Sequence, residues 1–194
     1  TIFNIPFSQY ARTDISFVHY NYIDEKTIFA YKLYGGIGVP YGNAEALPYE
    51  KSFFGGGANN LRAWQLRALG PGHSVSSSSN RYDRAGDIML GANFEYRFPI
   101  VSFIEGAAFW DLGNIWTLKE EKGLEGGQFK FDEFYKEIAS GIGLGVRLNI
   151  KVLIVRFDFS AKVYDPSKDM DSRFVLDNTK LSDIVLQFGI GYPF

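Results

Sequence analysis

The sequence predicts an all-β protein, an antiparallel transmembrane β-barrel, and three observations carry this prediction. Apolar and polar side chains alternate along several long segments, and such alternation places successive side chains on opposite faces of a strand. These segments exceed the roughly 5–6 residues of an ordinary strand and reach the roughly 9–11 that a membrane-spanning strand needs. The connections between them are short and long in turn, as the two rims of an outer-membrane barrel require.

Seven segments are expected to form the strands, and they differ in the clarity of their alternation. Asp14–Tyr22 has an ambiguous phase, and Thr27–Val39 and Ser102–Trp116 alternate loosely. Four others alternate clearly: Gly86–Phe98, Glu137–Asn149, Val152–Tyr164 and Ser182–Phe194. We therefore expect residues 1–194 to form one barrel domain with about seven or eight strands.

Three long connections separate the expected strands, and the first is the longest. It covers residues from about 40 to 85, while the other two cover 118–136 and 165–181. Tight turns at 97–100 and 149–151 alternate with these loops. The pattern indicates short turns on one rim and long loops on the other.

A soluble β-sandwich or lipocalin-like barrel is the competing fold, because it also alternates and also contains many aromatic residues. Gly141, Gly143 and Gly145 share the polar face of one expected strand. Small residues relieve crowding inside a lumen but contribute little on an outer surface. The glycines and the strand lengths therefore favour the membrane barrel.

The composition excludes several classes of function. The 20 basic and 22 acidic residues give a net charge of −2, so no basic surface for nucleic acid is expected. The chain has no Cys, and its two histidines, His19 and His73, do not form a metal-ligand cluster in the sequence. The Gly-x-Ser-x-Gly motif of nucleophilic hydrolases does not occur. We expect neither an enzyme nor a bound cofactor or metal.

One stretch of the first long loop has an unusual composition. Consecutive glycines release the backbone from its usual restriction, and a single arginine then follows between apolar residues. The residues of this loop motif are Gly55, Gly56, Gly57, Leu61, Arg62, Ala63 and Trp64.

Two carboxylates on the expected inner face are candidate partners of this arginine. A buried arginine needs a carboxylate, and a loop folded into the lumen would place Arg62 between Glu95 and Asp111 in a charge-assisted contact. A solvated Arg62 explains the residues equally well. Glu95 and Asp111 could also serve as general acid and base, but a charge pair in a polar lumen is the simpler interpretation.

Four motifs then occur in a defined order along the chain. They are Phe54–Gly57 with Leu61–Trp64, the segment Gly91–Pro99, the segment Phe109–Gly113 and the final Leu186–Phe194. In this order they resemble the bacterial surface-antigen superfamily of outer-membrane assembly factors, the BamA and TamA type. The resemblance extends from about Tyr31 to Phe194.

The resemblance implies roles for individual residues. It assigns Arg62, Glu95 and Asp111 to a contact that locks the loop in the lumen. One departure stands in the loop motif, because Ala63 occupies the position of the family's usual glycine. The strand motif would include Phe109 and Gly113, and the terminal strand would include Phe188, Tyr192 and Phe194.

The resemblance also implies that this chain is part of a larger barrel. The family barrel has sixteen strands and amino-terminal periplasmic domains, and the matching region is its carboxyl-terminal half. A half barrel has two unpaired edges, which cannot persist in lipid. We expect pairing between copies, closure into a small barrel, or a preceding portion of the protein.

By the same resemblance, we expect an outer-membrane protein assembly, insertion or translocation factor that uses no bound nucleotide. It would be integral to the bacterial outer membrane, in contact with the lipid bilayer. Its expected partners are unfolded outer-membrane protein clients and accessory lipoproteins, with self-association through unpaired strand edges and no nucleic acid. The alternative is a passive porin or a structural surface antigen, which shares the alternation but does not require the Arg–Glu–Asp set.

Overall fold

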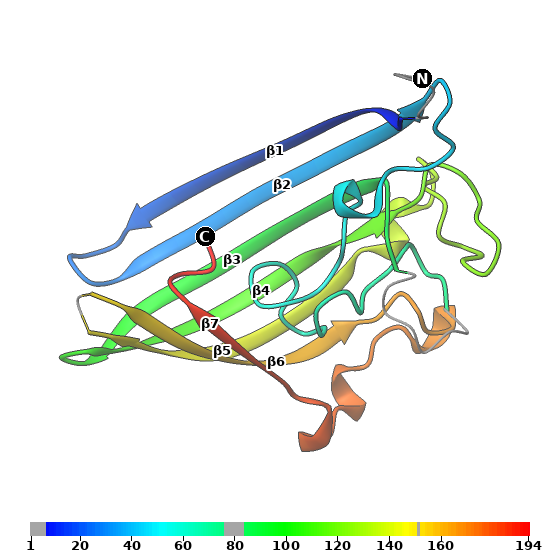
Figure 1. Cartoon of the computed structure of the whole chain (residues 1–194). Helices are drawn as coiled ribbons and strands as arrows, with labels where there is room; N and C mark the ends of the chain where they lie inside the picture. Colours follow the sequence, from blue (N-terminus) through cyan, green and yellow to red (C-terminus); the bar gives the residue numbers. More distant parts are fainter. Residues whose placement is uncertain (1–6, 76–83, 151) are drawn as a thin grey trace.

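The computed structural model describes residues 7–75, 84–150 and 152–194, and its strands form one antiparallel sheet (Figure 1). Each strand pairs with the next in sequence, so the order is β1 to β7 without a crossover. This all-β antiparallel architecture confirms the predicted fold class. The strands are β1 (Gln9–Tyr22), β2 (Ile28–Tyr41), β3 (Ile88–Val101), β4 (Ile104–Trp116), β5 (Ala139–Asn149), β6 (Ile154–Tyr164) and β7 (Val185–Ile190).

The sheet is curved like a trough and leaves two edges, β1 and β7 (Figure 1). Within the described ranges no strand pairing joins these edges. The helical segments are single turns of 3-10 helix, and no described helix has the length and apolar character needed to cross a membrane. They are η1 (Tyr49–Lys51), η3 (Phe134–Glu137), η4 (Met170–Ser172), η5 (Leu176–Asn178) and η6 (Leu181–Asp183).

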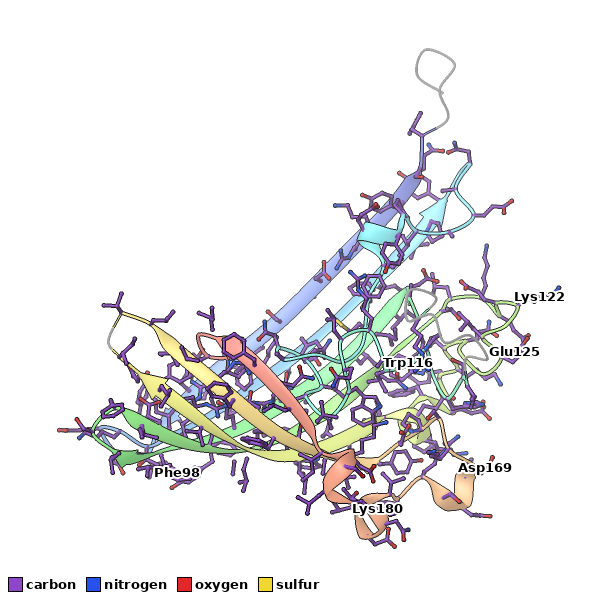
Figure 2. The ribbon with its side chains drawn as sticks, turned by 60° about the horizontal axis from the view of Figure 1, so that its bottom comes forward. Phe98, Trp116, Lys122, Glu125, Asp169 and Lys180 are labelled. Carbon is purple, nitrogen blue, oxygen red and sulfur yellow. The ribbon has the colours of Figure 1, made fainter. Side chains whose placement is uncertain are left out.

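The two ends of the sheet differ in the length of their connections. Short turns follow β1, β3 and β5, and long loops follow β2, β4 and β6. Figure 2 shows Phe98 at the short-turn rim, whereas Lys122, Asp169 and Lys180 lie at the other end, on the long loops. In outer-membrane barrels the short turns face the periplasm and the long loops face the outside.

The two faces of the sheet differ in polarity, as strand alternation requires. Apolar side chains project from the outer face and remain exposed, among them Phe17, Leu33, Trp110, Leu144, Phe159 and Phe188. Polar and charged side chains on the inner face are buried, among them Asn93, Glu95, Asp111, Arg147, Arg156 and Asp158. A continuous exposed apolar face with a polar interior is the arrangement of a barrel that faces lipid.

The glycines on the inner face of β5 make room for neighbouring groups. A Cβ atom at Gly143 would lie 2.3 Å from the Phe109 ring, and one at Gly141 would lie 2.5 Å from the Cβ of Ala63. Real Cβ atoms do not approach so closely, so neither position accepts a larger residue without movement of its neighbours. The glycine face therefore lets the loop and the β4 side chains approach the sheet.

The boundaries of the first and last strands correct the sequence prediction. β1 begins at Gln9, whereas the prediction began at Asp14. β7 covers only Val185–Ile190 of the expected Ser182–Phe194. Local pattern missed this second boundary because the break depends on Gly191, whose φ of +81° ends the extended backbone.

The residues after β7 turn onto the inner face of the sheet and do not continue the terminal strand. The Tyr192 hydroxyl donates a hydrogen bond to Glu105 Oε2 at 2.7 Å, and Arg97 Nη2 donates to the backbone oxygen of Phe194 at 3.1 Å. The Arg97 guanidinium also lies 4.2 Å from the centre of the Tyr192 ring. Tyr192 and Phe194 therefore lie inside the trough, whereas Phe188 remains on the outer face.

Candidate functional site

The loop between β2 and β3 folds back into the hollow of the sheet (Figure 1). In its segment of residues 61–69, Leu61–Trp64 and Leu69 are buried, although loops usually lie on the surface, whereas Gln65 and Leu66 are exposed. An apolar cluster fastens this segment against the start of β5, and its members are Leu61, Ala63, Trp64, Leu69 and Ala139. The inward fold brings the loop motif to the polar face of the strands.

Arg62 lies at the centre of the buried loop segment and binds two carboxylates. Its Nε and Nη2 atoms donate to the two oxygens of Asp111 at 2.9 and 2.8 Å, which is a bidentate contact. Its Nη1 donates to Glu95 Oε2 at 2.5 Å. The backbone N–H of Arg62 also donates to Asp111, at 3.1 Å. The structure thus brings together Arg62, Glu95 and Asp111, with each side chain at most 1% exposed.

Neighbouring groups orient Asp111 and the Arg62 guanidinium. Asn93 on β3 donates from Nδ2 to Asp111 at 2.8 Å and to the carbonyl of Asn60 in the loop at 2.7 Å. The Phe109 ring on β4 lies under the Arg62 guanidinium, and the guanidinium carbon is 3.4 Å from the centroid of the ring. These contacts hold the guanidinium in one plane and satisfy its charge on more than one side.

The cluster around Arg62 is larger than the sequence suggested. Asp158 Oδ2 lies 3.7 Å from Arg62, and three further arginines lie near these carboxylates. The contacts are Arg97 to Glu95 at 2.8 Å, Arg147 to Glu95 at 3.1 Å and to Asp158 at 3.0 Å, and Arg156 to Asp158 at 2.6 Å. Alternation places Arg97, Arg147, Arg156 and Asp158 on polar faces, but no sequence signal connects them with Arg62.

Four arginines therefore share three buried carboxylates. The Arg147 guanidinium lies within ion-pair distance of two carboxylates, but its nitrogens form no hydrogen bond of good geometry. Buried ions are costly unless they are paired, so loss of one member leaves its partner with that cost. The cluster is consequently sensitive to the exact position of the loop.

The last two strands also hold the loop by its backbone. Ser160 Oγ on β6 donates to the Arg62 carbonyl at 2.7 Å, and Gln187 Nε2 on β7 donates to the carbonyls of Arg62 and Trp64 at 3.2 and 3.0 Å. Arg156 Nη2 donates to the carbonyl of Ala58 at 2.9 Å. These contacts link the loop to the final strands as well as to β3 and β4.

Ala63, at the position where the resembling family has glycine, fits without strain. In the described part of the chain, Arg67 is the only non-glycine residue with a positive φ. The backbone of Ala63 therefore lies outside the left-handed region that favours glycine. The methyl group of Ala63 is buried and faces Gly141, where a Cβ atom would collide with it. A glycine on β5 therefore compensates for the larger loop residue.

The remaining motif residues have mainly conformational roles. Gly56 and Gly57 have φ values of +92° and +102°, which favour glycine, and Gly55 forms a β-bridge with Leu69. Gly113 has a φ of +151°, and a Cβ atom there would lie 2.5 Å from the carbonyl oxygen of Leu90. The glycine run thus shapes the loop turn, and Gly113 permits close packing of β3 and β4.

The electrostatics of the site suit binding of the loop more than acid–base chemistry. Burial alone would lower the pKa of the Arg62 guanidinium, but the charges of Asp111 and Glu95 outweigh burial and raise that pKa above its usual value. Arg62 therefore keeps its charge. In the residues that the structure describes, no group of three His, Cys, Asp or Glu side chains is arranged to hold a metal ion.

These features define a class of protein: an outer-membrane-type barrel sheet, apolar outside and polar inside, with a loop bound within its lumen. A family model for the Omp85 superfamily domain matches residues 6–194. The chain belongs to the Omp85 superfamily, whose members are outer-membrane assembly and transport barrels.

Comparison with solved structures shows the same fold. The chain is similar to BamA from Haemophilus ducreyi lacking POTRA domains 1–3, with a TM-score of 0.62 and 16% sequence identity. The match covers 94% of this chain and 34% of that chain, so this chain spans about a third of the length of its structural relative. Comparison with curated protein sequences finds no significant match.

Proposed function

We propose that this chain forms the loop-bearing part of an integral outer-membrane barrel that assembles, inserts or translocates other outer-membrane proteins. The observation that carries the proposal is the lumen loop bound through Arg62 to Glu95 and Asp111. Membership of the Omp85 superfamily supports it. The protein works as a binding and scaffolding device, without catalysis or a cofactor.

In this proposal the ion cluster locks the loop in one position within the lumen. The cluster is closed to water, and its partners come from β3, β4 and β6. A locked loop stiffens the sheet around it, while the edges of the sheet remain able to pair with an incoming strand by β-augmentation. The unfolded client then gains main-chain hydrogen bonds before it enters the bilayer.

The expected partners are the lipid bilayer, unfolded outer-membrane proteins and accessory lipoproteins.

The direction of the two free edges limits self-association. β1 and β7 run the same way across the sheet, because an odd number of antiparallel strands starts and ends in one direction. Two copies in one membrane orientation would therefore pair these edges in parallel. An antiparallel seam needs a further strand that runs from the short-turn rim to the long-loop rim.

The test is the substitution Arg62→Ala in the full-length protein, with Arg12→Ala as the matched control. Arg12 forms a salt bridge with Asp14 on β1, but these side chains are 28% and 53% exposed. We expect Arg62→Ala to lower the amount of folded client barrels in the outer membrane and Arg12→Ala to leave it unchanged. Unchanged client levels in both variants, together with a steady open conductance, would instead indicate a passive porin or surface antigen.

A further inference from the structure

The lumen loop touches the rest of the chain at a second place, far from Arg62. His73 Nδ1 forms a hydrogen bond with Glu137 Oε1, at the end of η3 just before β5. The second oxygen of Glu137 accepts a hydrogen bond from the indole nitrogen of Trp116 at 2.6 Å. Figure 2 shows Trp116 at the end of the sheet from which the loop carrying Lys122 and Glu125 extends. This contact therefore lies at the long-loop rim.

The backbone around His73 is shaped for this contact. Gly72 has a φ of +52° and Gly126 a φ of +82°. Gly72 lies close to the Gly126 carbonyl, and Gly126 lies close to the His73 ring. A Cβ atom at Gly126 would lie 2.4 Å from Nε2 of the His73 imidazole, and one at Gly72 would lie 2.2 Å from the Gly126 carbonyl oxygen. Only glycine allows both approaches, so the two loops meet at a built contact.

Asn114 on β4 adds hydrogen bonds that seat the same segment. Its Nδ2 donates to the carbonyls of Gly72 and Glu137, at 2.8 and 2.6 Å. The backbone N–H of Gly72 donates to the Ile115 carbonyl at 2.7 Å, and that of His73 donates to Gly126 at 3.1 Å. Strand β4 thus aligns the two partners of the contact.

The charge on Glu137 depends on His73 for an ion-pair partner. The Glu137 side chain is 5% exposed and that of His73 is 42% exposed, and among the described residues His73 is the one cation-forming group within ion-pair distance of Glu137. Lys130 contributes a weaker long-range field and pairs with Glu133 at 3.0 Å, and Arg173 donates to the carbonyl of Lys136 at 2.9 Å. Arg84 donates to the carbonyl of Ala68, Asp87 accepts from the N–H of Leu118 at 2.9 Å, and Glu125 accepts from the N–H of Gly123 at 3.0 Å, so each of these charged groups has another partner.

We propose that His73 and Glu137 form a proton-dependent clasp that fastens the lumen loop at the long-loop rim, independently of the Arg62 cluster. Histidine is the side chain whose charge ordinarily changes between about pH 5 and pH 8. Protonated His73 meets the buried carboxylate as an ion, whereas neutral His73 offers it only an ordinary hydrogen bond. The clasp is therefore tighter in acid and looser as the pH rises. The inference rests on the proposed role of the loop and adds a means of regulating it from outside.

Hydrogen exchange of the full chain in a lipid bilayer tests the clasp, with rates corrected for the intrinsic effect of pH. Protection of the backbone N–H groups at 72–75 should fall about three- to tenfold from about pH 5.5 to about pH 8, because a charge-assisted hydrogen bond weakens to a neutral one. Protection of residues 60–64, beside the Arg62 cluster, should stay constant. Constant protection of 72–75 in the wild type would overturn the proposal.

Three variants separate charge from shape. His73→Gln keeps a neutral hydrogen-bond donor and should abolish the pH dependence at 72–75, and Glu137→Gln should do the same. Gly126→Ala should open the segment at both pH values, because its methyl group takes the place of the imidazole. A wild-type pH dependence in His73→Gln would overturn the clasp. The proposed function fails separately, through unchanged client levels in Arg62→Ala, so the two outcomes are distinguishable.

Discussion

The covered part of the sheet, β3 to β7, and the largely exposed strand β1 contain ion pairs of the same kind in opposite surroundings. Arg62 and Asp111 are 2.8 Å apart, and Arg12 and Asp14 are 2.7 Å apart. The first pair is at most 1% exposed, whereas the second is 28% and 53% exposed. The N···O distances of the two pairs are thus nearly equal, and the pairs differ in how far they are buried. A buried pair must stay intact because its members have no water to replace a lost partner, and an exposed pair does not.

The largest effect should come from Arg62→Ala, which strips Asp111 of its bidentate partner. We expect a loss of about 3–5 kcal/mol in the free energy of unfolding, as for other broken buried pairs. Urea unfolding of the lipid-reconstituted protein, followed by tryptophan fluorescence, measures it. Arg62→Lys should recover only part of the loss, because an ammonium group cannot bind both carboxylate oxygens in one plane. A loss below that of Arg12→Ala would contradict the comparison.

A smaller effect should follow from overfilling the covered side with Gly143→Val. Its side chain would enter the space of the Phe109 ring, which packs against Arg62. We expect a loss of about 1–3 kcal/mol in unfolding free energy. The matched control is Leu144→Val, one residue along on the exposed outer face, which should cost clearly less in a lipid environment. Equal losses for the two variants would show that the inner glycine face is not a packing constraint.

The smallest effect should come from Arg12→Ala on the exposed strand β1. Its exposed salt bridge with Asp14 should contribute about 0–1 kcal/mol to the free energy of unfolding, and less at high salt. The Arg12 guanidinium also lies 4.3 Å from the centre of the Phe53 ring. A salt-independent loss larger than this range would therefore assign the contribution of Arg12 to packing against Phe53 rather than to the ion pair.

The sequence permitted a detailed prediction of the strands and a partial one of the site. Of the seven strands, alternation located four clearly, two loosely and β1 without a definite phase, since it depends only on residues close in the chain. It made β7 too long at both ends: residues 181–183 form a 3-10 turn, and the contacts of Tyr192 and Phe194 with β3 and β4, beyond the positive φ of Gly191, are not local features. The motifs singled out Arg62, Glu95 and Asp111, and the structure places these three side chains in contact.

The sequence alone determined the polarity of each face and the alternation of short turns with long loops. Both follow from the two-residue period of a strand and from the spacing of the strands along the chain. Only the tertiary structure decided that Arg97, Arg147, Arg156 and Asp158 join the cluster of Arg62. It also decided that Ala63 faces Gly141 and that His73 meets Glu137. These contacts join residues far apart in the chain, and they depend on the curvature of the sheet and the path of the loop across it.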